Sequence, residues 1–336
     1  MDGSCPYRPT YATPVKVLVT GATSLVGGHT ATQLAELGHE VTVFQRSPSG
    51  LSVAEFCGSL TNVNEVRPAV AGQDAVVHLA AKVGVTGTWD EFYQTNVRGT
   101  QTLIEAAQKA GVGRFVHVSS PSVAHGGAAL VGAPAGVADP TSTRGHYATS
   151  KALAEQYALA ASSSSMPIVA LRPHLIWGPG DTQLVGRIVA KTKAGRMAMI
   201  GSGNALIDST FITNAVDAIV AAVDAAPGLG GQAFVVSNGQ PRTVSELIGR
   251  IAVAAGLTPT DRHVPARLAL AGGWLAERTW ERQQRTDDPP MTSFLAEQLS
   301  TAHWFDQRAT RDALNWTPKV GIDEGFERLR AWFQQQ

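Results

Sequence analysis

The feature that most constrains the fold is an alternation of short apolar runs with helix-like segments, which begins at Val15. The first run, residues 15–20, is rich in β-branched side chains. A Gly/Ser turn follows it, and helical spacing then extends over residues 30–37 and ends at Gly38. Strands that alternate with helices favour right-handed βαβ units, so the pattern predicts an α/β fold with a doubly wound parallel sheet. Further strands are expected over residues 41–44, 75–79, 115–119 and 168–172, and helices over residues 100–110 and 148–161.

The turn after the first expected strand is rich in glycine. Residues 20–28 read Thr-Gly-Ala-Thr-Ser-Leu-Val-Gly-Gly. In a Rossmann-type sheet, such a turn lets backbone amides and the following helix N-terminus contact a pyrophosphate. Ser24 stands where the TGxxGxxG pattern has its middle glycine, so its side chain either crowds the phosphate or donates a hydrogen bond to it. Glycine-rich turns also serve other strand-to-helix connections, so further residues are needed to identify a nucleotide.

The end of the second expected strand indicates which dinucleotide binds. NAD-binding proteins often place an Asp or Glu about 20 residues after the glycine motif, where it accepts hydrogen bonds from the ribose 2′-hydroxyl. Here residues 43–47 contain no carboxylate, and Arg46 offers a guanidinium that suits a 2′-phosphate. The sequence therefore favours NADP(H) over NAD(H). The alternative is that Arg46 is an ordinary exposed arginine.

Tyr147 and Lys151 lie four residues apart, hence on one face of an expected helix. A nearby ammonium favours tyrosinate and lowers the phenol pKa, so Tyr147 is expected to exchange a proton with substrate while a hydride moves. Ser120 ends an expected strand at the carboxyl edge of the sheet, where it can hydrogen-bond the substrate oxygen. Ser119 and Ser122 compete for that role, and each serine can instead be a turn or cap residue.

The alternation weakens after Pro173, where glycine and proline become denser. We expect a dinucleotide-binding Rossmann domain over residues 15–175. Residues 176–336 are expected to form mainly a smaller, mixed substrate-binding lobe, with segments that return to the main sheet. Residues 1–14 have no apolar core and are expected to be a flexible extension. Lobe helices are expected over residues 243–255, 265–280 and 323–333, with a break at residues 287–290.

Composition argues against several other classes of protein. The 27 basic and 27 acidic residues balance, so the chain as a whole has no electrostatic basis for binding nucleic acid or anionic membranes. The only cysteines are Cys5 and Cys57, and no His/Cys cluster has metal-ligand spacing, so we expect neither a disulfide framework nor a metal site. Apolar runs fall below the roughly 18 residues of a transmembrane helix. These observations favour a reducing, cytoplasmic setting.

Taken together, these motifs resemble the extended short-chain dehydrogenase/reductase family, and the likeness extends from Val15 to Phe333. Residues 74–81, 96–100, 171–180 and 315–319 are similar to the family's other characteristic segments. The resemblance implies that Ser120, Tyr147 and Lys151 are catalytic. Departures are Ser24 and Gly58-Ser59, where the family often has Gly-Asp, and both put the tightness of cofactor binding in doubt. The cofactor contacts expected are Gly21, Thr23, Ser24, Leu25, Val26, Gly27, Arg46, Ser59, Leu60, Leu79, Ala80, Ala81, Asn96, Val118, Ser119, Tyr147, Lys151, Pro173, His174 and Leu175.

Within that family, residues 119–123 and 172–181 most resemble the 3β-hydroxysteroid dehydrogenase-like branch, and within it the 2-alkyl-3-oxoalkanoate reductases of bacterial olefin biosynthesis. This resemblance implies reversible reduction of a β-keto acid, with NADPH, to a 3-hydroxy acid. Three alternatives stay open. They are 3β-hydroxysteroid oxidation, sugar-nucleotide epimerisation or dehydration, and a non-catalytic NADP(H)-sensing or scaffold protein.

The sequence says less about substrate contacts and partners. The apolar stretch at residues 268–275 is expected to cover a long alkyl chain, to touch a membrane surface peripherally, or to pack as a buried helix. Arg98 and His174 are candidate substrate contacts, or structural hydrogen-bonding residues. The helices after Asn96 and around Tyr147 resemble those through which family members form homodimers, so a homodimer is expected.

Overall fold

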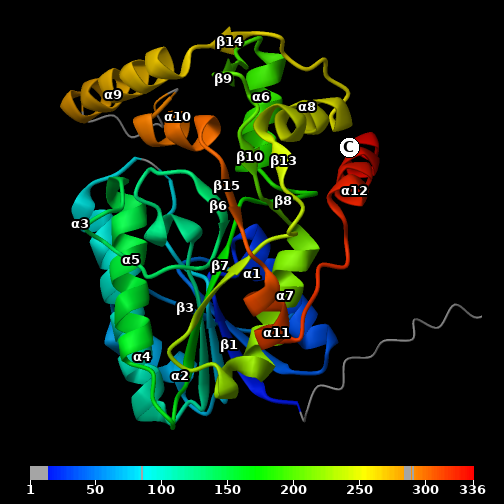
Figure 1. Ribbon diagram of the computed structural model, residues 1–336. Coiled ribbons are helices and arrows are strands. Elements are labelled where there is room, and N and C mark those ends of the chain that lie inside the picture. Colours follow the sequence, from blue (N-terminus) through cyan, green and yellow to red (C-terminus); the bar gives the residue numbers. More distant parts are fainter. Residues whose placement is uncertain (1–13, 85, 284–288, 290) are drawn as a thin grey trace, which may run out of the picture.

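The computed structural model describes residues 14–84, 86–283, 289 and 291–336 (Figure 1). The expected N-terminal extension, apart from Pro14, lies outside the described residues. So does the expected break at residues 287–290, apart from Pro289.

A seven-stranded parallel sheet forms the centre of the larger part of the molecule. Its strand order is β12-β7-β5-β4-β1-β2-β3, so the chain adds strands on one side of β1 and then continues on the other side. This order confirms the expected doubly wound fold, and it puts the ligand-binding crevice at the carboxyl ends of β1 and β4. The strands are β1 (Lys16–Thr20), β2 (Glu40–Gln45), β3 (Ala54–Cys57), β4 (Ala75–His78), β5 (Arg114–Val118), β7 (Ile168–Pro173) and β12 (Ala233–Val236).

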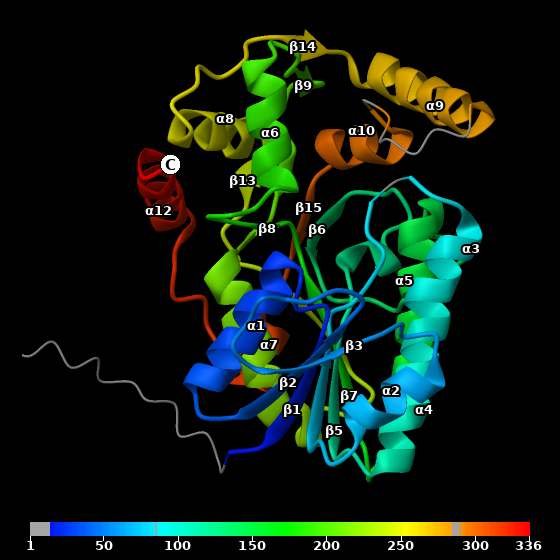
Figure 2. The same ribbon diagram turned by 180° about the vertical axis from the view of Figure 1, so that it is seen from behind.

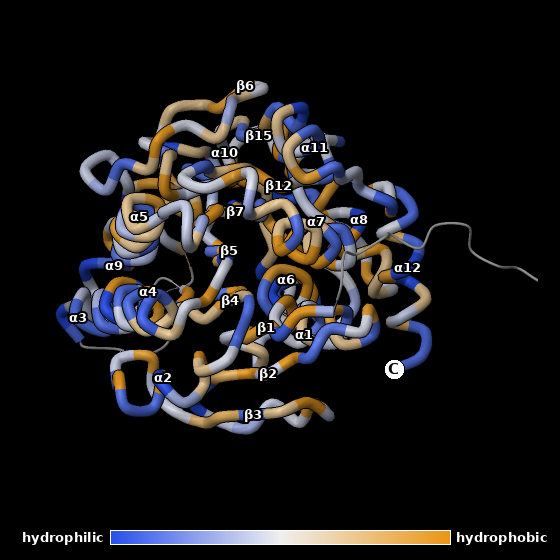
Figure 3. The backbone as a smooth tube through the Cα atoms, turned by 90° about the horizontal axis from the view of Figure 1, so that it is seen from below, coloured by the Kyte–Doolittle hydropathy of each residue, from blue (hydrophilic) through white to orange (hydrophobic). Residues whose placement is uncertain are grey.

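Helices cover both faces of this sheet (Figures 2 and 3). Strand β1 shows why its apolar run is continuous: Val17 and Val19 join one buried cluster, and Leu18 joins the other. On the first face lie α1 (Leu25–Glu36) and α7 (Ile212–Ala225), and on the second α2 (Val63–Val70), α4 (Gly99–Ala110) and α5 (Gly145–Ala160).

The smaller part lies over the carboxyl edge of the main sheet (Figure 1). It contains a four-stranded sheet in the order β13-β10-β15-β6. Strand β6 (Leu130–Ala133) comes from the connection between β5 and α5, so segments from both halves of the chain build this sheet. The other strands of the four-stranded sheet are β10 (Leu206–Ile207), β13 (Arg242–Thr243) and β15 (His303–Phe305). Two further two-stranded sheets pair β8 (Ile176–Trp177) with β11 (Thr210–Phe211), and β9 (Met199–Ile200) with β14 (His263–Val264).

The helices of the smaller part agree with the sequence where periodicity was clear. Helix α8 (Val244–Ala254) and helix α12 (Ile322–Gln334) lie within about one residue of their expected limits, and α9 (Ala266–Arg282) extends two residues beyond its expected end. The remaining helices of the described chain are α3 (Trp89–Phe92), the π-helix η1 (Tyr93–Arg98), the 3-10 helices η2 (Pro121–Ala124) and η3 (Ala226–Gly228), α6 (Leu184–Lys193), α10 (Ser293–Ser300) and α11 (Arg308–Leu314).

Candidate active site

The turn between β1 and α1 is built from glycines that no other residue could replace. Gly21 has φ +79°, and a Cβ there would lie 2.8 Å from the backbone of Ala80, at the end of the neighbouring strand β4. A Cβ on Gly27 would lie 2.3 Å from the Gly21 carbonyl oxygen. Two backbone segments therefore meet without intervening side chains at the start of α1. Such an exposed turn fits a dinucleotide pyrophosphate.

The Ser24 side chain, the first departure from the family pattern, makes hydrogen bonds within the turn. Its hydroxyl caps α1 by accepting from the Gly27 N–H at 3.1 Å, and it donates to the Gly21 carbonyl at 2.8 Å. The serine therefore closes the same turn that the glycines form. Thr23 and Ser24 are exposed, and Leu25 and Val26 are partly buried at the same helix start.

Arg46 is exposed directly after β2 and makes no hydrogen bond or ion pair with the described part of the chain. A carboxylate that could instead accept from a ribose 2′-hydroxyl lies on the neighbouring strand β3, as Glu55. Its oxygens already accept hydrogen bonds from the Ser49 N–H at 2.7 Å and from the Gln45 side chain. The guanidinium is therefore available at the tip where a 2′-phosphate is expected.

Two other expected cofactor contacts, Asn96 and Ser59, make hydrogen bonds within the protein. Asn96 is buried, and its amide accepts from the Lys82 N–H at 2.7 Å and donates to the Ser150 hydroxyl at 2.9 Å. This side chain ties the segment after β4 to the helix that carries Tyr147. Ser59 bonds to Glu65 and Thr61. Leu60, Leu79, Ala80, Ala81 and Val118 are all partly buried at or near the strand ends.

The three expected catalytic residues come together at the carboxyl end of β5. Tyr147 and Lys151 lie in the first two turns of α5, and Ser120 follows β5. The Lys151 ammonium donates to the Val118 carbonyl at 2.7 Å, which joins α5 to the strand end. The Ser120 side chain acts on the Tyr147 phenol, and its hydroxyl is 2.9 Å from the Ser122 hydroxyl. Ser119 is buried, and its hydroxyl has no partner within the described residues.

The expected lowering of the Tyr147 pKa is wrong. Burial raises the pKa of Tyr147 above its usual value, and the hydrogen bond with Ser120 is what opposes the rise. Burial also lowers the pKa of Lys151 to about 8, against the opposing charge of Glu155. The sequence prediction considered only the charge of the neighbouring ammonium, whereas burial has the larger effect on the pKa of both groups in the fold.

A second cluster of titratable groups lies where β7 meets the smaller sheet. His174 packs on His303 at 4.9 Å between ring centroids, and His303 packs on His125 at 6.3 Å. Each ring has one buried nitrogen without a hydrogen-bond partner in the described structure. Burial lowers the pKa of all three, so the rings are neutral at pH 7. Pro173 is buried beside this cluster, and Leu175 has the left-handed φ of +41°.

The sequence singled out His174 but missed His125 and His303. Both lie in segments with no recognisable motif, and His303 is brought to His174 by the pairing of β15 with β6 and β10. No periodicity predicts that contact. Arg98, the other candidate substrate contact, is exposed on η1 and bonds to Gln101, so it lies on a helix surface.

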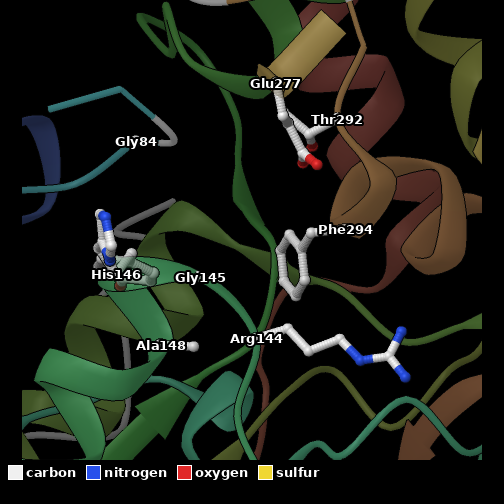
Figure 4. A pocket seen from close by; sticks show the side chains of 9 residues that line it. Gly84, Arg144, Gly145, His146, Ala148, Glu277, Thr292 and Phe294 are labelled. Atoms are coloured by element: carbon white, nitrogen blue, oxygen red, sulfur yellow. The ribbon is translucent and has the colours of Figure 1, made fainter. Parts of the chain in front are cut away.

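A pocket of about 250 Å³ opens beside Tyr147 (Figure 4). Its walls come from the start of α5, from the segment after β4, and from α9 and the start of α10. Figure 4 shows Phe294 below Glu277 and Thr292, with the Arg144 side chain extending away from His146. The exposed lining is mainly apolar, and it comprises Gly84, Arg144, Gly145, His146, Tyr147, Ala148, Glu277, Thr292 and Phe294.

The only two guanidinium or carboxylate groups in this lining have internal partners. Arg144 pairs with Glu297 of α10 at 2.8 Å, and Glu277 accepts from the Ser293 N–H and hydroxyl at 2.9 and 2.8 Å. The pocket therefore offers a ligand mainly apolar surface, and the charges of Arg144 and Glu277 are engaged in internal contacts. Within the described residues, no group of three or more His, Cys, Asp or Glu side chains is placed to hold a metal ion.

These features define the class of protein, and sequence comparison agrees. Residues 17–237 match the NAD dependent epimerase/dehydratase family, so the chain belongs to that family. The expected likeness to extended short-chain dehydrogenases/reductases is thereby confirmed.

Two relatives of named activity are similar to nearly the whole chain. The chain is 39% identical over 326 residues to a 2-alkyl-3-oxoalkanoate reductase from Stenotrophomonas maltophilia, across 94% of this chain and 99% of that protein. It is 32% identical over 345 residues to a 3-beta-hydroxysteroid dehydrogenase from Mycolicibacterium neoaurum, across 97% and 93% of the two chains. These names support the expected oxidoreductase class and branch.

Among solved structures, MoeE5 in complex with UDP-glucose and NAD has a TM-score of 0.73 to this chain. The two are 27% identical, and the match covers 95% of this chain and 99% of that one. The family thus uses a nicotinamide dinucleotide.

Within the described residues, no helix is both long and apolar enough to span a bilayer.

Proposed function

We propose that this chain is an NADP(H)-dependent ketoreductase that reversibly converts a 2-alkyl-3-oxoalkanoate to a 2-alkyl-3-hydroxyalkanoate. The observation that carries the proposal is that the hydroxyl side chains of Tyr147 and Ser120 lie together beside a pocket whose lining is mainly apolar. A hydrophobic ketone suits that lining, because burying its alkyl carbons is favourable by about 25 cal/mol per Å². The similarity to the Stenotrophomonas reductase over nearly the whole chain supports the same substrate class.

In the proposed reaction, a bound nicotinamide supplies or accepts the hydride at the substrate carbon. Tyr147 gives its phenolic proton to the ketone oxygen, and Ser120 donates a hydrogen bond to the same oxygen as charge develops there. Lys151, held at the end of β5, would bind the ribose hydroxyls and stabilise the tyrosinate that remains. The sum is ketone, NADPH and a proton giving secondary alcohol and NADP⁺.

The cofactor proposal leads to a test at Arg46. Arg46→Asp should weaken NADPH binding about tenfold to a hundredfold, because a charge-assisted hydrogen bond to the 2′-phosphate is lost. NADH lacks that phosphate, so its dissociation constant should change less than about threefold. Fluorescence titration of both dinucleotides measures this. Arg67→Asp, at another exposed arginine on α2, is the control. Equal weakening of NADPH and NADH by Arg46→Asp would defeat the assignment.

The substrate class is tested by following NADPH consumption with three kinds of compound. Racemic 2-alkyl-3-oxo acids should be reduced with the highest kcat/KM, ahead of 3-ketosteroids and UDP-sugars. Preference for the ketosteroid would instead support the dehydrogenase activity named for the Mycolicibacterium relative. Activity confined to UDP-sugars would establish an epimerase or dehydratase. Binding of NADPH without turnover of any compound would indicate the non-catalytic alternative.

The remaining parts of the proposal concern assembly and setting. We propose a homodimer that pairs α4 and α5 across its interface, acting in the cytoplasm in long-chain olefin biosynthesis. The exposed, free Cys57 is consistent with a reducing compartment. Light scattering on the purified protein gives the subunit number directly.

A further inference from the structure

We propose that the outward face of α9 docks on an anionic lipid surface and opens the Tyr147 pocket toward it. The docking itself follows from the surface of α9. The link to the pocket rests on the function proposed above.

Helix α9 has an apolar face that nothing in the described structure covers. Leu268, Trp274 and Leu275 are exposed by 65%, 53% and 62% of their surface. Such large apolar side chains gathered on one helix are unusual on a protein that has no partner there. In Figure 1, α9 lies at the upper left of the molecule, with α10 beneath it.

The opposite face of α9 packs closely against the start of α10. The apolar side chains of the outer face are therefore exposed on a helix that is held in place. A Cβ on Gly273 would lie 2.5 Å from the backbone of Thr292 and Ser293, which shows how closely α9 approaches the start of α10. Ala269 is buried, and Glu277 caps α10 through its bonds to Ser293. The inner face thus packs on α10 while the outer face stays open.

The charges among the exposed apolar residues are all positive in the described part of this face. Arg267, Arg278 and Arg282 are exposed. Leu275 follows Leu268 after two helical turns, and Arg278 and Arg282 follow Leu275 at three- and four-residue spacings, so these residues share one side of the helix. The Arg278 guanidinium lies 4.7 Å from the centre of the Trp274 ring. The zero net charge of the whole chain therefore conceals a local cationic face.

Leucine, tryptophan and arginine on one side of a helix are the combination that binds the interface of an anionic bilayer. The apolar side chains enter the acyl boundary, and the arginines meet lipid phosphates. A second copy of the chain is a poorer occupant, because a two-fold contact through this face would bring its arginines against one another. Charge complementarity therefore favours the lipid surface.

The same helix forms part of the pocket beside Tyr147. Glu277 of α9, together with Thr292 and Phe294 at the start of α10, lines that pocket. A helix seated on lipid would put this wall next to the acyl layer. If the substrate is a long-chain keto acid, it would then pass from the lipid to Tyr147 without crossing water.

The test is co-sedimentation of the full chain with vesicles of phosphatidylcholine alone, or mixed with phosphatidylglycerol. The native protein should bind the mixed vesicles, bind the neutral vesicles at least about tenfold more weakly, and dissociate at high salt. The triple variant L268S/W274S/L275S and the double variant R267E/R278E should each lose about tenfold or more in affinity. V131S/V137S, at residues exposed by 64% and 84%, is the matched control and should bind as the native protein does.

Absence of binding by the native protein to mixed vesicles would overturn the proposal, as would unchanged binding by both α9 variants. Light scattering is run on the same samples. If the triple variant changes subunit number while vesicle binding persists, the face is a protein interface and the proposal is wrong. Turnover of a short-chain, water-soluble 3-oxo acid separates the two proposals. The α9 variants should retain it, and its absence from the native protein would reject the proposed function without affecting the docking result.

Discussion

Replacing Tyr147 with phenylalanine is expected to lower kcat about a hundredfold to ten-thousandfold, the range typical for loss of a general acid. The side chain keeps its ring and loses only the hydroxyl that lies beside Ser120. The dissociation constant for NADPH should stay within about threefold, because the turn at Gly21 and the guanidinium of Arg46 are untouched. Stopped-flow measurement of NADPH oxidation separates the reaction step from binding.

Tyr157→Phe is the matched control for this variant. Tyr157 lies on the same helix, but its hydroxyl bonds to Glu105 at 3.1 Å on the exposed side. Its removal should leave kcat within about twofold. Unchanged turnover in Tyr147→Phe would remove the proposed mechanism. A loss of NADPH binding in that variant would instead show that the phenol supports the cofactor site.

The second large effect is expected at the buried ion pair between Arg172 and Glu155. Both side chains are 1% exposed or less, and the Arg172 Nε donates to Glu155 Oε2 at 2.9 Å. Glu155→Leu leaves a buried guanidinium without its partner, which should cost about 3–5 kcal/mol of unfolding free energy. Urea unfolding followed by circular dichroism measures the change.

The exposed pair between Arg328 and Glu324 provides the contrast, because solvent screens it. Glu324→Leu should cost less than about 1 kcal/mol. The double variant Glu155→Leu with Arg172→Met should recover part of the stability, since no unpaired charge stays buried. A cost below about 1 kcal/mol for Glu155→Leu alone would mean that water or rearrangement satisfies Arg172.

Glu155→Leu should also shift the pH profile of catalysis. Burial lowers the pKa of Lys151 to about 8 even though the charge of the Glu155 carboxylate raises it. Without Glu155, the folded-state pKa of Lys151 falls further, so the ammonium is lost at a lower pH. The alkaline limit of kcat/KM should therefore move to lower pH in this variant.

Local sequence patterns predicted much of the main sheet. The strands β1, β2, β4, β5 and β7 were recognisable because they are apolar on both faces, as a covered parallel sheet requires. The start of α1 was placed too late, at residue 30 instead of Leu25, because Ser24 was considered as a phosphate contact and not as the helix cap.

Other elements could not be found in the same way. Strand β3 is exposed along its length, and it is defined by its pairing with β2 rather than by an apolar run. Strand β12 is short and lies far along the chain from its partner β7. Long-range pairing of this kind depends on the assembled sheet, which no local pattern records.

The candidate site was predicted unevenly for the same reason. Tyr147, Lys151 and Ser120 lie near each other in the fold as expected, although their roles stay predictions. The direction of the Tyr147 pKa was wrong because desolvation depends on the packing of distant segments. The histidine cluster of His125, His174 and His303 arises from the same kind of distant contact.

The pairing of β12 with β7 bears on how the chain can be divided. A fragment ending at residue 175 would leave one edge of β7 unpaired and would remove α7 from the apolar face it covers. Such a fragment should aggregate instead of binding nucleotide independently. The half expected to hold the dinucleotide would then not be an excisable module, and we expect it to mature only after the ribosome has released most of the polypeptide.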